Sequence, residues 1–121
     1  MAHSIALVDD ESYVRLSLVG ELTLTDHQIA RAEAAVALAE NGWDKLLIDA
    51  VHAEPKMSAA DDFHFTGEHH QHFSASLRTA IIHRPDATEG FKFIENIAKN
   101  RGMNVKSFTD RSQALDWLLK A

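Results

Sequence analysis

Histidines are frequent in this chain, and they are the first residues whose chemistry invites a hypothesis. The chain has 8 histidines, and four of them fall in one short segment: His64, His69, His70 and His72. On a helix, His64 could share a metal ion with Glu68, and His69 with His72. His64 and His72 would lie ~12 Å apart along the axis, at about 1.5 Å per residue, which is too far to share one ion. Because a third ligand such as His52 would have to come from elsewhere, we predict no physiological metal site.

A second polar group follows the apolar runs that predict strands. His52, His83 and Arg84 lie at or just past the carboxyl ends of two such runs, with Asp49 close by. A carboxylate and an imidazole at this place could form a general acid/base pair. We favour the alternative that these side chains satisfy loop backbone and helix N-termini. The chain also has no Gly-x-Ser-x-Gly elbow, phosphate-binding loop or dinucleotide fingerprint, so we predict a non-enzymatic protein without a cofactor.

Composition narrows the class of protein. A formal net charge of -6 without a basic cluster argues against nucleic acid and anionic membranes as partners. The absence of cysteine excludes disulfides, thiolate zinc sites and thiol nucleophiles. No apolar segment approaches the roughly 20 residues of a membrane span, and the first residues do not form a signal peptide. We therefore expect a single cytoplasmic domain over residues 1–121.

The elements that must position these residues are organised around residues 45–50. This continuous apolar run predicts a strand buried on both faces in a parallel sheet, followed by a polar loop over 51–57. Alternation over 13–19, closed by Gly20, and a short run at 5–8 predict an antiparallel hairpin. Further strands are expected at 77–82 and 104–108. Helices are expected to begin at about residues 25, 58, 86 and 110.

Capping residues and helical spacing predict which side of each helix faces the core. The first helix is expected to be capped by Thr25 and Gln28, with its core stripe formed by Ile29, Ala32, Val36 and Ala39. The second should run from a cap at Ser58 to about residue 76, with Phe63, Thr66, Gly67 and His70 toward the core. Phe65 would then be an aromatic residue on the polar side, where with His69 and His72 it could form a protein interface or line a ligand cleft.

Together these elements have the order β-β-α-β-α-β-α-β-α. Strands that alternate with helices predict an α/β fold with right-handed crossovers. We expect a five-stranded, mostly parallel sheet with an antiparallel first strand and four helices. The third helix is expected to be capped by Asp86 and the fourth by Asp110.

Short motifs along the whole chain carry a family resemblance: Gly-Glu-Leu-Thr at 20–23, Asp49 after the central strand, Lys-Ser-Phe at 106–108, and Ala-Leu and Trp-Leu at 114–115 and 117–118. They resemble the STAS domains of sulfate transporters and anti-sigma-factor antagonists, and most closely the bacterial stand-alone SpoIIAA-like proteins. The resemblance implies an architecture shared with the CRAL-TRIO lipid-transfer proteins.

In the antagonists, the resemblance implies a phosphorylated serine after an aspartate at a helix N-terminus. Ser58 occupies about that place, but Met57 precedes it and Ala59 replaces the family's glycine, while the loop carries Lys56. We therefore favour Ser58 as a helix N-cap over a regulatory phosphorylation site.

The function predicted from these observations is a non-enzymatic, STAS-like regulatory or protein-interaction module. One alternative is a carrier of a small apolar or anionic ligand in a cleft between the second helix and the sheet. A further alternative is a metal-binding protein or metal-dependent enzyme that uses the 64–72 segment. The partner is then a protein or a small ligand, and a homodimer is plausible. The candidate interaction or ligand residues are Asp49, His52, Lys56, Ser58, Phe65, His69, His72, His83 and Arg84.

Overall fold

The elements follow the predicted order in the computed structural model, which describes residues 3–55 and 57–120. The strands are β1 (His3–Val8), β2 (Tyr13–Leu22), β3 (Lys45–Pro55), β4 (Arg78–Ile82) and β5 (Asn104–Phe108). The α-helices are α1 (Leu24–Asn41), α2 (Ala59–Gly67), α3 (His69–His72), α4 (Thr88–Asn100) and α5 (Arg111–Leu119). Single 3-10 turns, η1 (Asp9–Glu11) and η2 (Pro85–Ala87), precede β2 and α4.

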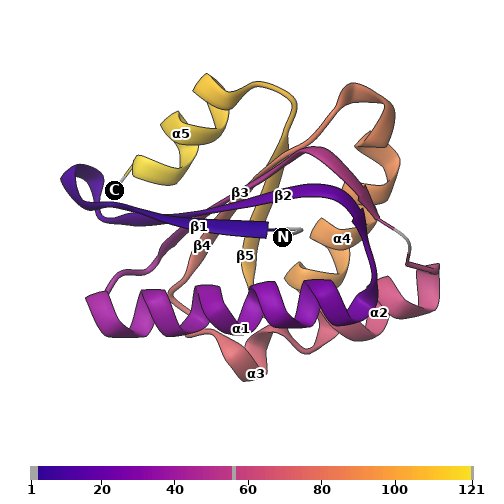
Figure 1. Cartoon of the computed structure of the whole chain (residues 1–121), viewed down its shortest axis with the longest axis horizontal. Coiled ribbons are helices and arrows are strands. Elements are labelled where there is room, and N and C mark those ends of the chain that lie inside the picture. The colour runs from indigo at the N-terminus through magenta and orange to yellow at the C-terminus, as the bar shows by residue number, and fades with distance from the viewer. Residues whose placement is uncertain (1–2, 56, 121) are drawn as a thin grey trace.

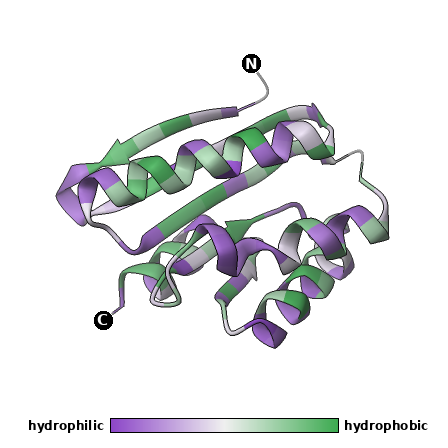
Figure 2. Cartoon of the chain, turned by 90° about the horizontal axis from the view of Figure 1, so that it is seen from below, coloured by the Kyte–Doolittle hydropathy of each residue, from purple (hydrophilic) through white to green (hydrophobic). Residues whose placement is uncertain are grey.

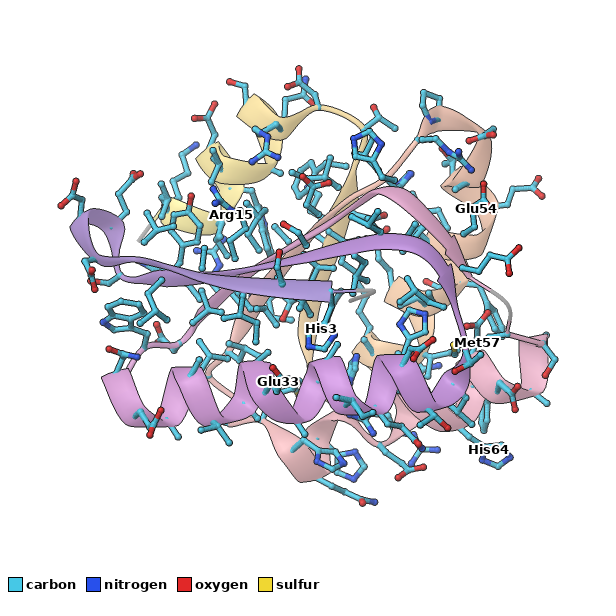
Figure 3. The ribbon with its side chains drawn as sticks, in the orientation of Figure 1. His3, Arg15, Glu33, Glu54, Met57 and His64 are labelled. Atoms are coloured by element: carbon cyan, nitrogen blue, oxygen red, sulfur yellow. The ribbon has the colours of Figure 1, made fainter. Side chains whose placement is uncertain are left out.

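The five strands form one sheet in the order β1-β2-β3-β4-β5, with β3 at its centre (Figure 1). β1 pairs with β2 in the antiparallel direction, whereas the other neighbouring pairs are parallel. The predicted fold class and the interior position of β3 are therefore confirmed. At the open edge of the sheet, Nε2 of His3 in β1 lies 2.9 Å from Oε2 of Glu33 in α1 (Figure 3).

Helices cover both faces of the sheet, as Figure 1 shows. On one face of the sheet, buried strand residues such as Leu16 of β2 and Leu46 of β3 pack against α1 and α4. Ala34 is among the residues that α1 contributes to this core. On the other, Leu47 and Ala80 pack against Leu118 of α5. Because side chains alternate along a strand, a strand covered on both faces must be apolar throughout. In Figure 2, the strands carry runs of hydrophobic residues, whereas hydrophobic and hydrophilic residues alternate along the helices.

The neighbouring strands β2 and β3 are both longer than predicted. β2 does not end at Gly20, because glycine adopts φ +79° there and the strand continues to Leu22. The register with β3 shifts between Ser17 and Val19, which is typical of a β-bulge. β3 continues to Pro55 by pairing with the end of β2, so most of the predicted 51–57 loop is strand.

The start of α1 and its buried face both differ from the prediction. The N-cap is Thr23, not Thr25: Thr23 Oγ1 accepts from the Asp26 amide at 3.2 Å, and Asp26 Oδ2 accepts from the Thr23 amide at 2.9 Å. The buried residues are Ala30, Arg31, Ala34 and Leu38, whereas the expected stripe is exposed, with Ile29 at 48% and Val36 at 56%. Alanines at the contact let the helix lie close to the sheet. Hydrophobicity alone selected the wrong side.

The predicted second helix is interrupted. α2 ends at Gly67, and the four-residue α3 follows after Glu68. Thr66 and Gly67 are buried as expected, but Phe63 and His70 are exposed, whereas Phe65 turns inward. Ser58 does cap α2, since its hydroxyl accepts from the Asp61 amide at 3.1 Å.

The later elements are closer to prediction. In α4, Ile97 and Ala98 face the core and are buried. Its expected cap is wrong, because Asp86 lies inside η2 and forms an ion pair with Arg84 at 3.4 Å. Asp110 caps α5 as predicted, accepting from the Ser112 amide at 2.8 Å. Within residues 3–55 and 57–120, the helices are too short or too polar to cross a membrane.

The two threonines at the start of α1 provide a test of the cap assignment. Thr23→Ala removes the acceptor of the capping box and is expected to lower the free energy of unfolding by about 1 kcal/mol. Thr25→Ala, inside the helix, should change it by much less. Urea unfolding of both variants measures the difference, and a larger loss at Thr25 would contradict the assignment.

Candidate functional site

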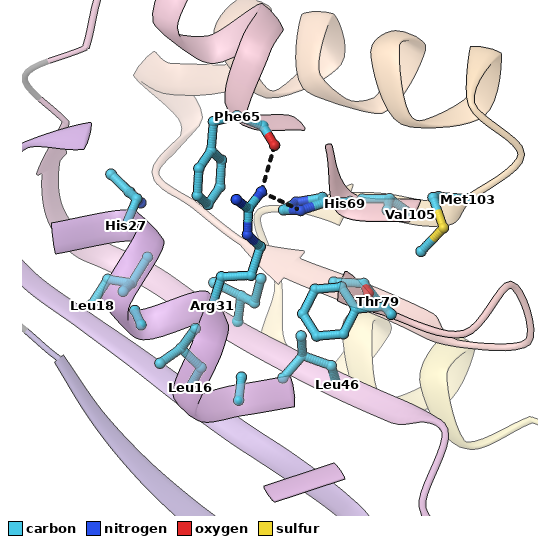
Figure 4. Close-up of a pocket in the computed structure, with 14 residues that line it drawn as sticks. Leu16, Leu18, His27, Arg31, Leu46, Phe65, His69, Thr79, Met103 and Val105 are labelled. Atoms are coloured by element: carbon cyan, nitrogen blue, oxygen red, sulfur yellow. Dashed lines mark hydrogen bonds between the residues drawn. The ribbon is translucent and has the colours of Figure 1, made fainter. Parts of the chain in front are cut away.

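Arg31 of α1 lies at the centre of the most unusual polar environment in the described chain. The residue is only 5% exposed. Its Nη1 donates to the carbonyl oxygen of Phe65 at 2.6 Å and to Nδ1 of His69 at 3.3 Å (Figure 4). The guanidinium carbon also lies 4.0 Å from the centroid of the Phe65 ring. One side chain therefore links the long helix α1 to both α2 and α3.

Aromatic rings surround this guanidinium. The Phe65 ring meets His27 of α1 at 5.6 Å and His69 at 5.1 Å between centroids, both edge to face. His69 in turn meets Phe73 at 5.7 Å. Phe65, His69 and Phe73 follow one another at intervals of four residues, which is the spacing of one side of a helix, and they keep this row although the helix is interrupted after Gly67. We call Arg31, His27, Phe65 and His69 the Arg31 cluster.

Burial sets the charge state of the cluster. The pKa of His69 is lowered to about 3, first by burial and then by the charges of Arg31 and His72. Burial also lowers the pKa of His27, against a smaller opposing effect of Asp26. Since arginine can only donate, Nδ1 of His69 must be the unprotonated nitrogen of a neutral ring. Arg31 is thus a buried cation whose hydrogen-bond acceptors are uncharged.

Two adjoining cavities lie beneath α2 and α3. The first, of about 50 Å³, lies between α1 and the sheet and is lined by the whole Arg31 cluster. The second, of about 80 Å³, continues under α2 toward α4. Both are lined by Leu18, His27, Ile48, Phe65 and His69. A cleft between the second helix and the sheet, predicted for the carrier alternative, therefore has a counterpart in the structure.

The other candidate residues lie apart from this cluster. Asp49 accepts from Nη2 of Arg111 of α5 at 2.5 Å. His83 is buried on the face of the sheet opposite to Asp49, and its ring stacks on that of Phe91 of α4, with 4.7 Å between the centroids. The structure does not bring Asp49 and His83 together as an acid/base pair. His52 is an exposed residue of β3, and Arg84 lines a pocket of about 170 Å³ beside α4 that shares Ala50, Asp62 and Ile94 with the second cavity.

Along the segment 58–72, the candidate residues point in different directions. Ser58 is exposed at the start of α2, and His64 projects outward (Figure 3). His72 lines another pocket, of about 390 Å³, with Trp43 and Phe73. Lys56 lies outside the described residues. Across residues 3–55 and 57–120, no group of three or more histidine, aspartate or glutamate side chains is arranged to hold a metal ion.

The sequence predicted Phe65 and His69 as candidates but missed Arg31 and His27. An arginine in an alanine-rich helix has the pattern of a solvated charge. The available signal was its position, since Arg31 directly follows Ala30 and lies three residues before Ala34, on the small-residue side of the helix. This position predicts a buried arginine only when the small-residue side of α1 is known to face the sheet.

Comparison with known proteins agrees with this architecture. No protein-family model matches the chain, and no curated protein matches it. Among solved structures, an uncharacterized DUF3478-family protein with a SpoIIAA-like fold from Shewanella loihica is 28% identical, with a TM-score of 0.61 over 97% of this chain and 92% of that chain. An anti-sigma factor antagonist from Mycobacterium paratuberculosis is 13% identical, with a TM-score of 0.66 over 98% and 95%.

The anti-sigma factor antagonist SpoIIAA in its unphosphorylated form is also similar. It is 16% identical, with a TM-score of 0.61, and 96% of each chain is covered. These likenesses cover almost the full length of every chain compared. The chain has the SpoIIAA-like fold, as the sequence motifs predicted.

The neutral state of His69 makes stability depend on pH. Because the folded pKa lies below the ordinary value of 6.5, the unfolded chain binds more protons as the pH falls through 6.5. The stability that is present above pH 6.5 is then progressively lost. Between pH 7 and pH 5 the free energy of unfolding should fall by about 1–2 kcal/mol from this residue, and His27 acts in the same direction.

Denaturant unfolding at several pH values measures this dependence. His69→Gln keeps an acceptor for Arg31 but does not titrate, so its stability should vary less with pH over this range. His64→Gln, at an exposed position, is the matched control and should keep the wild-type dependence. An unchanged dependence in His69→Gln would contradict the burial of a neutral His69.

Proposed function

We propose that this protein is a non-enzymatic regulatory module that binds a protein partner through the outer surface of α2. We define this surface as the exposed residues Ser58, Ala59, Phe63 and His64. It directly follows the carboxyl end of the central strand, where open α/β sheets commonly place functional residues. The similar antagonist structures support an interaction role by fold analogy only.

The observation that carries the proposal is an exposed aromatic residue on this surface. Phe63 is 46% exposed, and its ring lies 6.0 Å from the guanidinium carbon of Arg101 and 6.0 Å from the His64 ring centroid. Aromatic and arginine side chains are enriched in the centres of protein interfaces. The sequence pattern had assigned this place to Phe65, which instead packs inside.

The positions of the polar candidates also favour a non-enzymatic role. Asp49 is held by Arg111, and the Nδ1 of His83 lies 2.8 Å from the Arg84 carbonyl oxygen while its ring stacks on Phe91. These contacts satisfy the side chains structurally and orient them toward different faces of the sheet. Both therefore act as structural polar groups in this proposal.

Two substitutions on this surface test the proposal. Phe63→Ala removes the aromatic contact. Ser58→Asp adds a charge while keeping a residue type that caps helices well, so folding should be preserved. The partner would be captured from an extract of cells that express the protein, identified by mass spectrometry, and then titrated as a purified protein. Each substitution is expected to weaken binding about tenfold or more.

Phe93→Ala is the matched control, because Phe93 of α4 is a comparably exposed phenylalanine outside this surface. It should bind the partner as the wild type does. If Phe63→Ala and Ser58→Asp both bind with wild-type affinity, or if only Phe93→Ala weakens binding, the proposed surface is wrong.

A further inference from the structure

The Arg31 cluster contains a buried positive charge that is not ion-paired with any described carboxylate. In the described part of the chain, no aspartate or glutamate forms an ion pair with Arg31. Glu68 influences its pKa only as a smaller effect that opposes burial. A buried cation that is hydrogen-bonded only to neutral groups is costly, and an anion at the same place would offset that cost.

The guanidinium also has an unused edge. Both of its hydrogen bonds to described residues use Nη1, whereas Nε is buried without a partner among those residues. Nε2 of His27 is likewise buried and unpartnered. Both side chains line the first cavity. The Nε–Nη2 edge of arginine matches the two oxygens of a carboxylate, and the neutral ring of His27 can donate from Nε2 in one tautomer.

Apart from Thr79, the rest of the wall of the first cavity is apolar. Leu16, Leu18, Leu46, Ile48 and Val105 line the first cavity beneath the cluster. Both cavities exceed the roughly 10–15 Å³ that one water requires, but neither has the size of a pocket for a large cofactor. The space therefore suits a short apolar group attached to one small charged group.

We propose that this cavity binds a small organic monocarboxylate, with its carboxylate on the Nε–Nη2 edge of Arg31 and its apolar group along the sheet. This site goes beyond the proposed protein-interaction surface, since Arg31 faces inward and Phe63 outward. It also names the residues and the ligand chemistry of the small-ligand alternative.

The second cavity defines the orientation and limits the charge of the ligand. Asp62 of α2 lines this cavity and not the first. Its carboxyl would repel a second negative charge, so a dicarboxylate or a phosphate ester is disfavoured at that end. A monocarboxylate with its charged group at Arg31 and its apolar end toward Ile81 and Ile94 avoids this repulsion.

Hexanoate and hexanol provide a matched pair of probes, because they share an alkyl chain and differ in charge at neutral pH. Isothermal titration calorimetry of the full chain should show hexanoate binding about tenfold or more tightly than hexanol. Arg31→Met keeps the apolar volume of the side chain and removes the charge. It should lose this preference, so that it binds hexanoate no more tightly than hexanol. Arg101→Met removes an exposed charge and is the control, with wild-type behaviour expected.

Each result bears on the site. If the wild type binds neither probe, binds both equally, or if Arg31→Met binds hexanoate as tightly as the wild type, the proposal is overturned. Should Arg31→Met lose both probes, Arg31→Lys decides, because it restores the charge. A recovered preference for hexanoate supports the site, and no preference overturns it. Loss of hexanoate binding with intact partner binding would leave the proposed α2 surface unaffected.

Discussion

The structure depends on burying β3 on both faces. Leu46 packs toward α1 and α4 and the adjacent Leu47 toward α5, so neither face of the strand can be left in water. The two layers of helices follow from this constraint, and so does the separation of the polar candidates between them. Asp49 belongs to the layer of α5, whereas the Arg31 cluster belongs to the opposite layer. The end of β3 then leads directly into α2.

The segment α2–α3 is attached to the rest of the fold by polar and aromatic contacts more than by buried apolar residues. Thr66 and Gly67 are its fully buried residues, Phe65 and His69 are half-buried, and many of its other side chains are exposed. Arg31 compensates for the small apolar contact, since it reaches the Phe65 carbonyl, the Phe65 ring and His69 from α1. Sites of function are commonly placed where packing is weaker and polar groups are incompletely satisfied. An inner cavity and an outer aromatic surface therefore share one short, lightly packed segment.

Much of the fold could be predicted because its signals are local. The apolar run at 45–50 and the helix caps at Ser58 and Asp110 each depend on a few neighbouring residues. Element ends were harder to predict, because the continuation of β2 past Gly20 depends on pairing with β3. The N-cap of α1 was hard to predict because Thr23 and Thr25 are the same residue type, two positions apart.

The site was less accessible from sequence for a physical reason. Phe63 and Phe65 are equal on any hydrophobic scale, and the one that turns inward is the one that contacts Arg31, His27 and His69. In α1, the larger apolar residues Ile29 and Val36 face outward, because alanines allow the closest approach to the sheet. Both choices are set by tertiary contacts between residues distant in sequence. Phe65 and His69 were expected to form a protein interface or line a ligand cleft, and both line the two cavities, but their arginine partner was not predicted.

Arg31 holds α2 and α3 over the sheet through its contacts with Phe65 and His69. Hydrogen–deuterium exchange of the wild type and of Arg31→Met, compared residue by residue, tests it directly. Our account predicts faster exchange of amides in 59–72 when Arg31 is replaced, with the central amides of β3 and β4 unchanged. Unchanged exchange in 59–72, or equal acceleration throughout the sheet, would contradict it.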